Sequence, residues 1–232
     1  MGKSRNGKIA TGLSIAAFFF VTISFFTPNW LVTDGQLKNP KFEKIGLWVV
    51  CFKGFQDARH WYDTEFCHCW WVFEEEFYII FDILLPGFYV ATQFFFSLTF
   101  LGLFFTCICI LFYLCSSRHN DHFITLLIVM GVTSGASALT GSLALLIFGY
   151  NGDARVWMPN WEHNDIGYSY ALGVLGVICA YLAGGLFLVE ARAHKFKRQR
   201  AMGGGRAGGH QYEDEYGMEQ RGVHGKSEHT EI

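Results

Sequence analysis

The stretch Gly46-Leu47-Trp48-Val49-Val50-Cys51 (GLWVVC) lies between two long apolar segments, in an interval of the chain that carries many charges. Together with Ile45 and Phe52 it is rich in β-branched and aromatic residues, which favour a β-strand. The segment from Cys67 to Phe73 has a similar composition, so we expect the two to pair antiparallel. Because so small a sheet has no core of its own, its apolar face must pack on other elements.

Four apolar segments dominate the rest of the chain. Half of the 232 residues are hydrophobic and only 16% are charged, which leaves too little polar surface for a soluble domain of this size. The apolar residues gather at residues 9–26, 87–114, 123–150 and 168–189. Each block is about as long as the roughly 20 residues with which a helix crosses a bilayer. The sequence predicts an all-α four-span membrane protein, and the absence of charges near the span centres argues against a proton relay or ion pump.

Basic residues near the span ends predict the orientation. They are Lys3, Arg5 and Lys8 before the first span, Arg118 between the second and third, and Arg192, Lys195, Lys197, Arg198 and Arg200 after the fourth. Because cytoplasmic flanks carry an excess of Lys and Arg, we expect both termini in the cytoplasm. Residues 27–86 and 151–167 then form outer loops. The first loop also contains lysines, but long loops cross the membrane largely regardless of their charge.

Three of the seven cysteines, Cys51, Cys67 and Cys69, lie in the first outer loop, where the compartment is oxidising. Cys51 can pair with either Cys67 or Cys69, whereas a bridge between Cys67 and Cys69 would be strained. The leftover thiol is either buried or paired between molecules. The remaining cysteines lie within spans or at a span end and should stay thiols. Among them, Cys115 at the inner edge of the second span is a candidate palmitoylation site.

Trp30, then Gly46-Leu47-Trp48, then Cys51 and a later cysteine, all between the first two spans, resemble the W…GLW…C…C signature of the claudin family. The resemblance covers essentially the whole chain before the tail. It implies a left-handed four-helix bundle with an extracellular antiparallel sheet built from both outer loops. It also implies a function in cell–cell junction strands and paracellular sealing. Taken singly, Trp30 and Trp48 are typical of anchors at headgroup depth.

The chain also departs from the claudin pattern. Fifteen residues separate Cys51 from Cys67, more than is usual between the two cysteines of a claudin, and there is a third cysteine. Gln93 stands where vertebrate members commonly have arginine early in the second span. His68 or Trp70 stands where some cation-passing members have an acidic residue. These differences indicate a divergent member, most like the invertebrate claudins of septate junctions.

The second outer loop carries an aromatic cluster, Trp157, Met158 and Trp161. We expect it to be exposed and to contact a protein on the opposing cell. The alternative is that these side chains rest on lipid headgroups. In the first loop, the acidic run of residues 74–76 either lines a polar path for cations or forms a solvated turn. His68 between two cysteines does not predict a metal site, because neighbours in a strand point to opposite faces.

Small residues recur at four-residue spacing in the last two spans. They are Gly131 and Gly135 in the third span and Gly176, Ala180 and Gly184 in the fourth. Such spacing allows helices to approach closely in lipid. The close contacts lie either within the bundle or between neighbouring protomers, and the sequence leaves both open.

The composition changes after the last span, so we divide the chain into a four-span domain at residues 1–190 and a disordered cytoplasmic tail at residues 191–232. A basic stretch that should lie on the inner leaflet is followed by glycine-rich and acidic segments. The final residues, Thr230-Glu231-Ile232, fit a class I PDZ ligand, with a hydroxyl, an aliphatic end and a free carboxylate.

The sequence and the resemblance together predict a junction protein of the lateral plasma membrane that contributes to an epithelial barrier. Its expected partners are the lipid bilayer, other claudin-like protomers in cis and trans, and PDZ scaffold proteins. No catalytic residue, cofactor, metal or nucleic acid is expected. The alternative is an auxiliary subunit of an ion channel or receptor, because the claudin-like superfamily includes gamma-type subunits with PDZ-binding ends.

Overall fold

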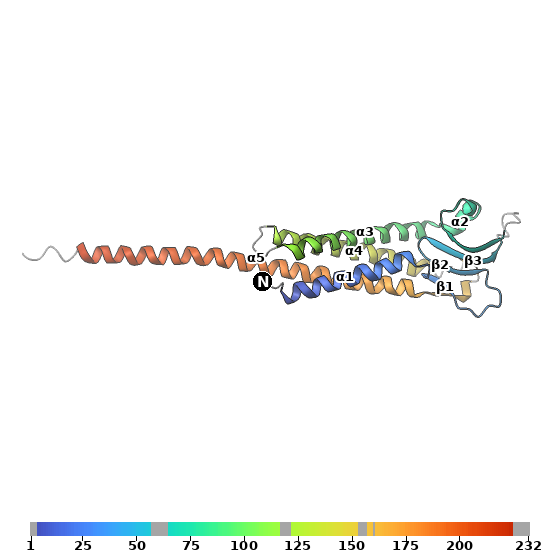
Figure 1. The fold of residues 1–232 in the computed structure, drawn as a ribbon, viewed down its shortest axis with the longest axis horizontal. Helices are drawn as coiled ribbons and strands as arrows, with labels where there is room; N and C mark the ends of the chain where they lie inside the picture. The colour runs from blue at the N-terminus through green and yellow to red at the C-terminus, as the bar shows by residue number, and fades with distance from the viewer. Residues whose placement is uncertain (1–3, 57–64, 117–121, 153–156, 160, 225–232) are drawn as a thin grey trace, which may run out of the picture. The chain divides into compact units, whose positions relative to one another are not determined.

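The computed structural model of the protein describes residues 4–56, 65–116, 122–152, 157–159 and 161–224. The chain divides into two compact units, Met1–Leu188 and Val189–Ile232, and each is described by itself. The first unit contains a bundle of helices with a small antiparallel sheet at one end, as Figure 1 shows.

The bundle consists of helices α1 (Arg5–Phe26), α3 (Gly87–Cys115), α4 (Phe123–Asn151) and the first part of α5 (Tyr168–His224). All four are long and apolar enough to cross a membrane, which confirms the predicted four-helix fold class. Local signals set their ends. Ser4 caps α1 by accepting a hydrogen bond from the Gly7 amide at 3.0 Å. The helix ends just before Pro28, because a residue that precedes proline disfavours the helical conformation.

The sheet has five strands in the order β4-β3-β2-β1-β5, and every neighbouring pair is antiparallel. Its strands are β1 (Leu31–Thr33), β2 (Phe42–Ile45), β3 (Val49–Phe55), β4 (Phe66–Trp71) and β5 (Asn164–Ile166). The segment between β4 and α3 forms two short helices, η1 (Glu75–Ile80) and α2 (Phe81–Leu84), and the short helix η2 (Trp161–His163) precedes β5. Both connections contribute strands, as the family resemblance implies.

The predicted pairing of the two aromatic segments is confirmed, but the first segment is not one continuous strand. Residues 46–48 form a turn between β2 and β3, closed by a hydrogen bond from the Gly46 amide to the Val49 carbonyl oxygen at 2.8 Å. The strand prediction was wrong at these three residues. The turn forms because side chains of α3 bind its carbonyl oxygens, a long-range contact that composition does not reveal.

Small residues bring α4 and α5 close together inside the bundle. A Cβ atom added to Gly131 would lie 2.7 Å from a side-chain carbon of Leu188, and one added to Gly184 would lie 3.1 Å from the Gly131 carbonyl oxygen. The Ser134 hydroxyl donates to the Ala180 carbonyl oxygen at 2.9 Å across the same contact. Gly131, Gly184 and Ala180 therefore serve packing within the bundle.

In the second unit, helix α5 continues to His224, whereas the sequence predicts disorder from residue 191. The structure differs from the prediction here. No proline lies between Ala191 and His224, so every backbone amide of this part of the chain is available as a donor for the helix. The PDZ-ligand residues Thr230, Glu231 and Ile232 lie outside the described residues.

Candidate functional site: the sheet and its seat on the helices

Trp30 is the centre of the contact between the sheet and the bundle. Its side chain is completely buried and meets the rings of Phe96, Phe148 and Tyr170 edge-on, with centroid distances of 5.0, 5.0 and 5.7 Å. Its indole N–H donates to the Ser24 carbonyl oxygen at 2.8 Å. The Trp30 ring therefore fills the core between helices and is not exposed to lipid headgroups.

The backbone of Trp30 also joins two strands. Its amide donates to the Ile45 carbonyl oxygen, and its own carbonyl oxygen accepts from the Gly167 amide, both at 2.9 Å. Next to it, the Ser169 amide donates to the Asn29 carbonyl oxygen at 3.0 Å. The start of β1 is thereby tied to β2 and to the beginning of α5.

Two side chains of α3 hold the turn of residues 46–48. The Tyr89 hydroxyl donates to the Gly46 carbonyl oxygen at 2.5 Å, and the Gln93 amide donates to the Leu47 carbonyl oxygen at 2.6 Å. The Leu47 side chain is fully buried in the same core as Trp30. The sequence singles out Gln93 only as a departure from the family pattern. In the structure it donates a hydrogen bond to the turn where the sheet meets the bundle.

Gly46 lies where no side chain fits. A Cβ atom at this position would lie 2.6 Å from the Pro28 Cα and 2.7 Å from the Thr27 carbonyl oxygen. Both are backbone atoms, so they cannot move aside as a side chain would. The glycine of the GLW motif is therefore required by the close approach of the turn to the end of α1.

Trp48 lies half-buried at the edge of this seat. Its ring contacts Phe25 of α1, with a centroid distance of 5.3 Å, and Phe73 after β4, at 6.3 Å. The GLW motif thus points its leucine into the core and its tryptophan to the side of the bundle.

A disulfide bond joins Cys51 of β3 to Cys69 of β4, the second of the two pairings that the sequence leaves open. The two residues are directly opposite in the register of the strands. Cys67 is a free, exposed thiol on the same strand. Between them, His68 is exposed and has a positive φ of 77°.

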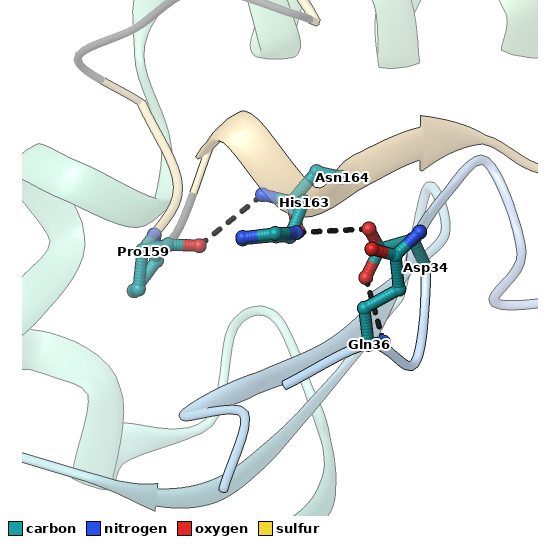
Figure 2. Close-up of polar contacts among 5 residues, drawn as sticks. All are labelled: Asp34, Gln36, Pro159, His163 and Asn164. Carbon is teal, nitrogen blue, oxygen red and sulfur yellow. Dashed lines mark hydrogen bonds and ion pairs between the residues drawn. The ribbon is translucent and has the colours of Figure 1, made fainter. Parts of the chain in front are cut away.

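The two connections between spans are also linked by a polar contact that sequence reasoning missed (Figure 2). The Asp34 amide donates to the His163 carbonyl oxygen at 2.8 Å, and the Asp34 carboxylate lies 2.9 Å from His163 Nδ1. The Gln36 amide donates to the same carboxylate at 2.9 Å. This backbone hydrogen bond and the His163 contact lower the pKa of Asp34. No pattern in the sequence joins two residues 129 positions apart.

The predicted aromatic contact cluster of the second connection is not exposed as a whole. Trp157 and Met158 are buried, and the Trp157 ring packs against Phe88 and Phe148 at centroid distances of 5.0 and 5.8 Å. The prediction that these two residues form a trans-contact surface was wrong, because the ends of α3 and α4 provide an aromatic pocket for them. Trp161 is partly exposed in η2.

Other residues singled out in the sequence lie away from the contact between the sheet and the bundle. Cys115 is exposed and is the last residue of α3, and its acylation stays a prediction. Glu74 and Glu75 are exposed at the start of η1. Within the described ranges, no three His, Cys, Asp or Glu side chains gather closely enough to hold a metal ion.

A comparison with protein-family models matches residues 15–189 to the model described as PMP-22/EMP/MP20/Claudin tight junction. The chain belongs to this family. The match covers most of the first apolar segment, the other three segments in full and all five strands, and it confirms the claudin resemblance. A comparison with curated proteins found no match. Within the claudin-family fold, the signature residues Trp30, Gly46, Leu47 and Cys51 seat the sheet on the bundle or tie its strands together.

Proposed function

We propose that this claudin-family protein assembles side by side in the lateral plasma membrane and contributes to the paracellular barrier of an epithelium, in a junction of the septate type. Both termini face the cytoplasm in this proposal, and the sheet lies in the space between cells. The role is structural and includes no catalysis. Family membership, the four membrane-length helices and the orientation expected from the basic flanks support it.

One observation carries the proposal furthest: the sheet is fixed to the helices at several separate points. Trp30, the turn of residues 46–48 and the start of α5 each hold a different strand end. The disulfide bond then ties β3 to the edge strand β4, whose side chains are exposed from Cys67 to Trp71. A sheet held this firmly presents its edge in a constant position relative to the membrane, which repeated lateral assembly requires.

The contact with an opposing cell is assigned to the exposed side chains of the sheet rather than to the second connection. Trp157 and Met158 are unavailable because they are buried. In contrast, Trp70 of β4 is exposed and does not line the groove at the end of α1. Aromatic side chains at an exposed strand are typical anchors of protein interfaces. The carboxyl-terminal Thr230-Glu231-Ile232 is proposed to recruit a PDZ scaffold, which would concentrate copies of the protein at the junction.

The experiment that tests the proposal is depletion of the protein from a polarised epithelium, followed by tracer flux between the cells and localisation of a tagged copy. We expect enrichment at the lateral junction, increased leakage after depletion and recovery when the wild-type chain is restored. Diffuse staining with an intact barrier would overturn the proposal. Co-purification of a channel or receptor complex in that case would identify the auxiliary-subunit function instead.

A further inference from the structure

An apolar groove opens beside the seat of the sheet, at the end of α1. Its volume is about 390 Å³, and Phe25, Phe26, Trp48, Val49 and Trp71 line it. The lining therefore comes from three elements: the last turn of α1, the start of β3 with its preceding turn, and the end of β4. A groove of this size lies within the range of small-molecule sites in proteins, and every side chain that lines it is aromatic or aliphatic.

The groove is continuous with the face of α1 that is directed to lipid. Ile15, Phe19 and Phe26 fall on one side of this helix by the 3.6-residue period, and their side chains are 53%, 60% and 61% exposed. Since α1 is one of the four apolar helices of a membrane protein, this exposed stripe faces acyl chains. Phe26 belongs to both the stripe and the groove, so the lipid-facing surface leads directly into it.

The far rim of the groove is also aromatic and exposed. Trp71 at the end of β4 is 59% exposed, and Phe73, which contacts Trp48, is 50% exposed. Aromatic rings are enriched where a membrane meets water, because they combine a large apolar surface with some tolerance of polar surroundings. The end of β4 therefore fits the boundary of the leaflet on the side of the sheet, here called the sheet-side leaflet.

We propose that this groove binds one acyl chain of a phospholipid from the sheet-side leaflet. An acyl chain requires only contact with hydrocarbon, which the lining supplies. A sterol would also need a partner for its hydroxyl group. The indole N–H of Trp48 is buried and has no acceptor, so it is not accessible to a ligand in the groove.

A bound chain would contact three parts of the molecule at once. It would contact the end of α1 through Phe26, the GLW turn through Trp48 and the edge strand through Trp71. The bound lipid would then hold the end of β4 in a fixed position relative to the membrane surface. This inference uses the membrane fold alone, and it holds or fails independently of the proposed barrier function.

Photolabelling of the full-length protein tests the inference. The protein is reconstituted in phosphatidylcholine vesicles that contain a phosphatidylcholine with a diazirine in one acyl chain, and labelled peptides are mapped by mass spectrometry. We expect label on the peptides of Val49 and Trp71, and a several-fold loss of that label in Trp71→Ser. The matched control is Leu146→Ser, because Leu146 is 69% exposed on α4 and does not line the groove. This control should keep the groove label.

Folding is checked separately by mapping the Cys51–Cys69 disulfide bond without reduction. If Trp71→Ser does not form the bond, Phe26→Ala takes its place with the same expected loss, since Phe26 is exposed at the other wall. Label on the exposed face of α4 without label in the groove would overturn the inference. So would equal groove labelling in folded Trp71→Ser and wild type, or groove labelling by a diazirine sterol that phosphatidylcholine does not displace.

Discussion

At the scale of single residues, the seat of the sheet depends on a few polar groups that meet backbone atoms. Gln93 and Tyr89 both reach from α3 to carbonyl oxygens of the GLW turn, in a region where water is excluded. A buried carbonyl oxygen that loses its donor keeps the cost of desolvation without a compensating bond. These two side chains therefore stabilise the turn of residues 46–48, a role that their positions in an apolar helix do not predict.

Replacement of Gln93 by leucine should destabilise the protein. The Leu47 carbonyl oxygen loses its donor, and the expected cost is about 1–3 kcal/mol. The measurement is the midpoint of thermal unfolding in detergent, which should fall. Gln93→Arg is the matched control, because it keeps a donor at the position where vertebrate claudins commonly have arginine. An unchanged midpoint in Gln93→Leu would show that the hydrogen bond does not hold the turn.

Gly46 and Gly12 form a second matched pair. Gly46→Ala places a Cβ atom against the backbone of Pro28 and Thr27, so we expect loss of the folded sheet. Gly12→Ala meets no atom within 4 Å and removes a glycine from a helix, so it should be neutral or stabilise the protein by up to about 1 kcal/mol. Yield of monodisperse protein and protease resistance measure the difference. Equal behaviour of the two variants would contradict the close-approach argument.

The contact between Asp34 and His163 predicts a dependence on pH. The folded state lowers the pKa of Asp34, so its stabilisation is complete above the unfolded value of about 3.9 and is lost as pH falls through the folded value. Asp34→Asn should remove this dependence. The measurement is the hydrogen-exchange protection of the Gln36 amide, which donates to the carboxylate. Protection in the wild type that stays constant down to pH 2 would refute the prediction.

At the scale of elements, the disulfide bond sets the position of the edge strand. Cys51 and Cys69 tie β3 to β4, and β4 has no other neighbour in the sheet order. The bond closes a loop with a sequence separation of 18. In the chain-entropy model a loop of this length contributes about 3 kcal/mol.

Cys69→Ser and Cys67→Ser should therefore differ. Cys69→Ser breaks the bond, and we expect it to expose residues 66–71 to proteases and to lower the free energy of unfolding by about 2–5 kcal/mol. Cys67→Ser should leave β4 intact because Cys67 is free and exposed. Limited proteolysis with peptide mapping distinguishes the two. A bond from Cys51 to Cys67 in wild-type protein would contradict the structure.

The elements differ in how well the sequence predicts them. Hydrophobic length alone predicts the four helices, because each segment satisfies the membrane by itself. Composition predicts the pairing of β3 with β4, but not the turn of residues 46–48, whose conformation depends on Tyr89 and Gln93 more than 40 residues away. The sequence also does not predict the burial of Trp157, because its pocket is formed by residues of other helices that are distant in the chain.

At the scale of the whole first unit, the sheet and the bundle share one core. Trp30, Leu47 and Trp157 are buried in the same core as residues at the ends of the helices that adjoin the sheet. A change in this shared core should therefore disturb the sheet without removing the helices from the membrane, because each helix contains an apolar segment long enough to cross it. The proposed barrier function requires this coupling.

The most direct test is rescue of the barrier in protein-depleted epithelium with Gly46→Ala and Gly12→Ala at matched surface levels. We expect that Gly12→Ala restores low tracer flux, whereas Gly46→Ala reaches the membrane but leaves the leakage unchanged. Equal restoration by both variants would contradict the claim that the seated sheet forms the barrier.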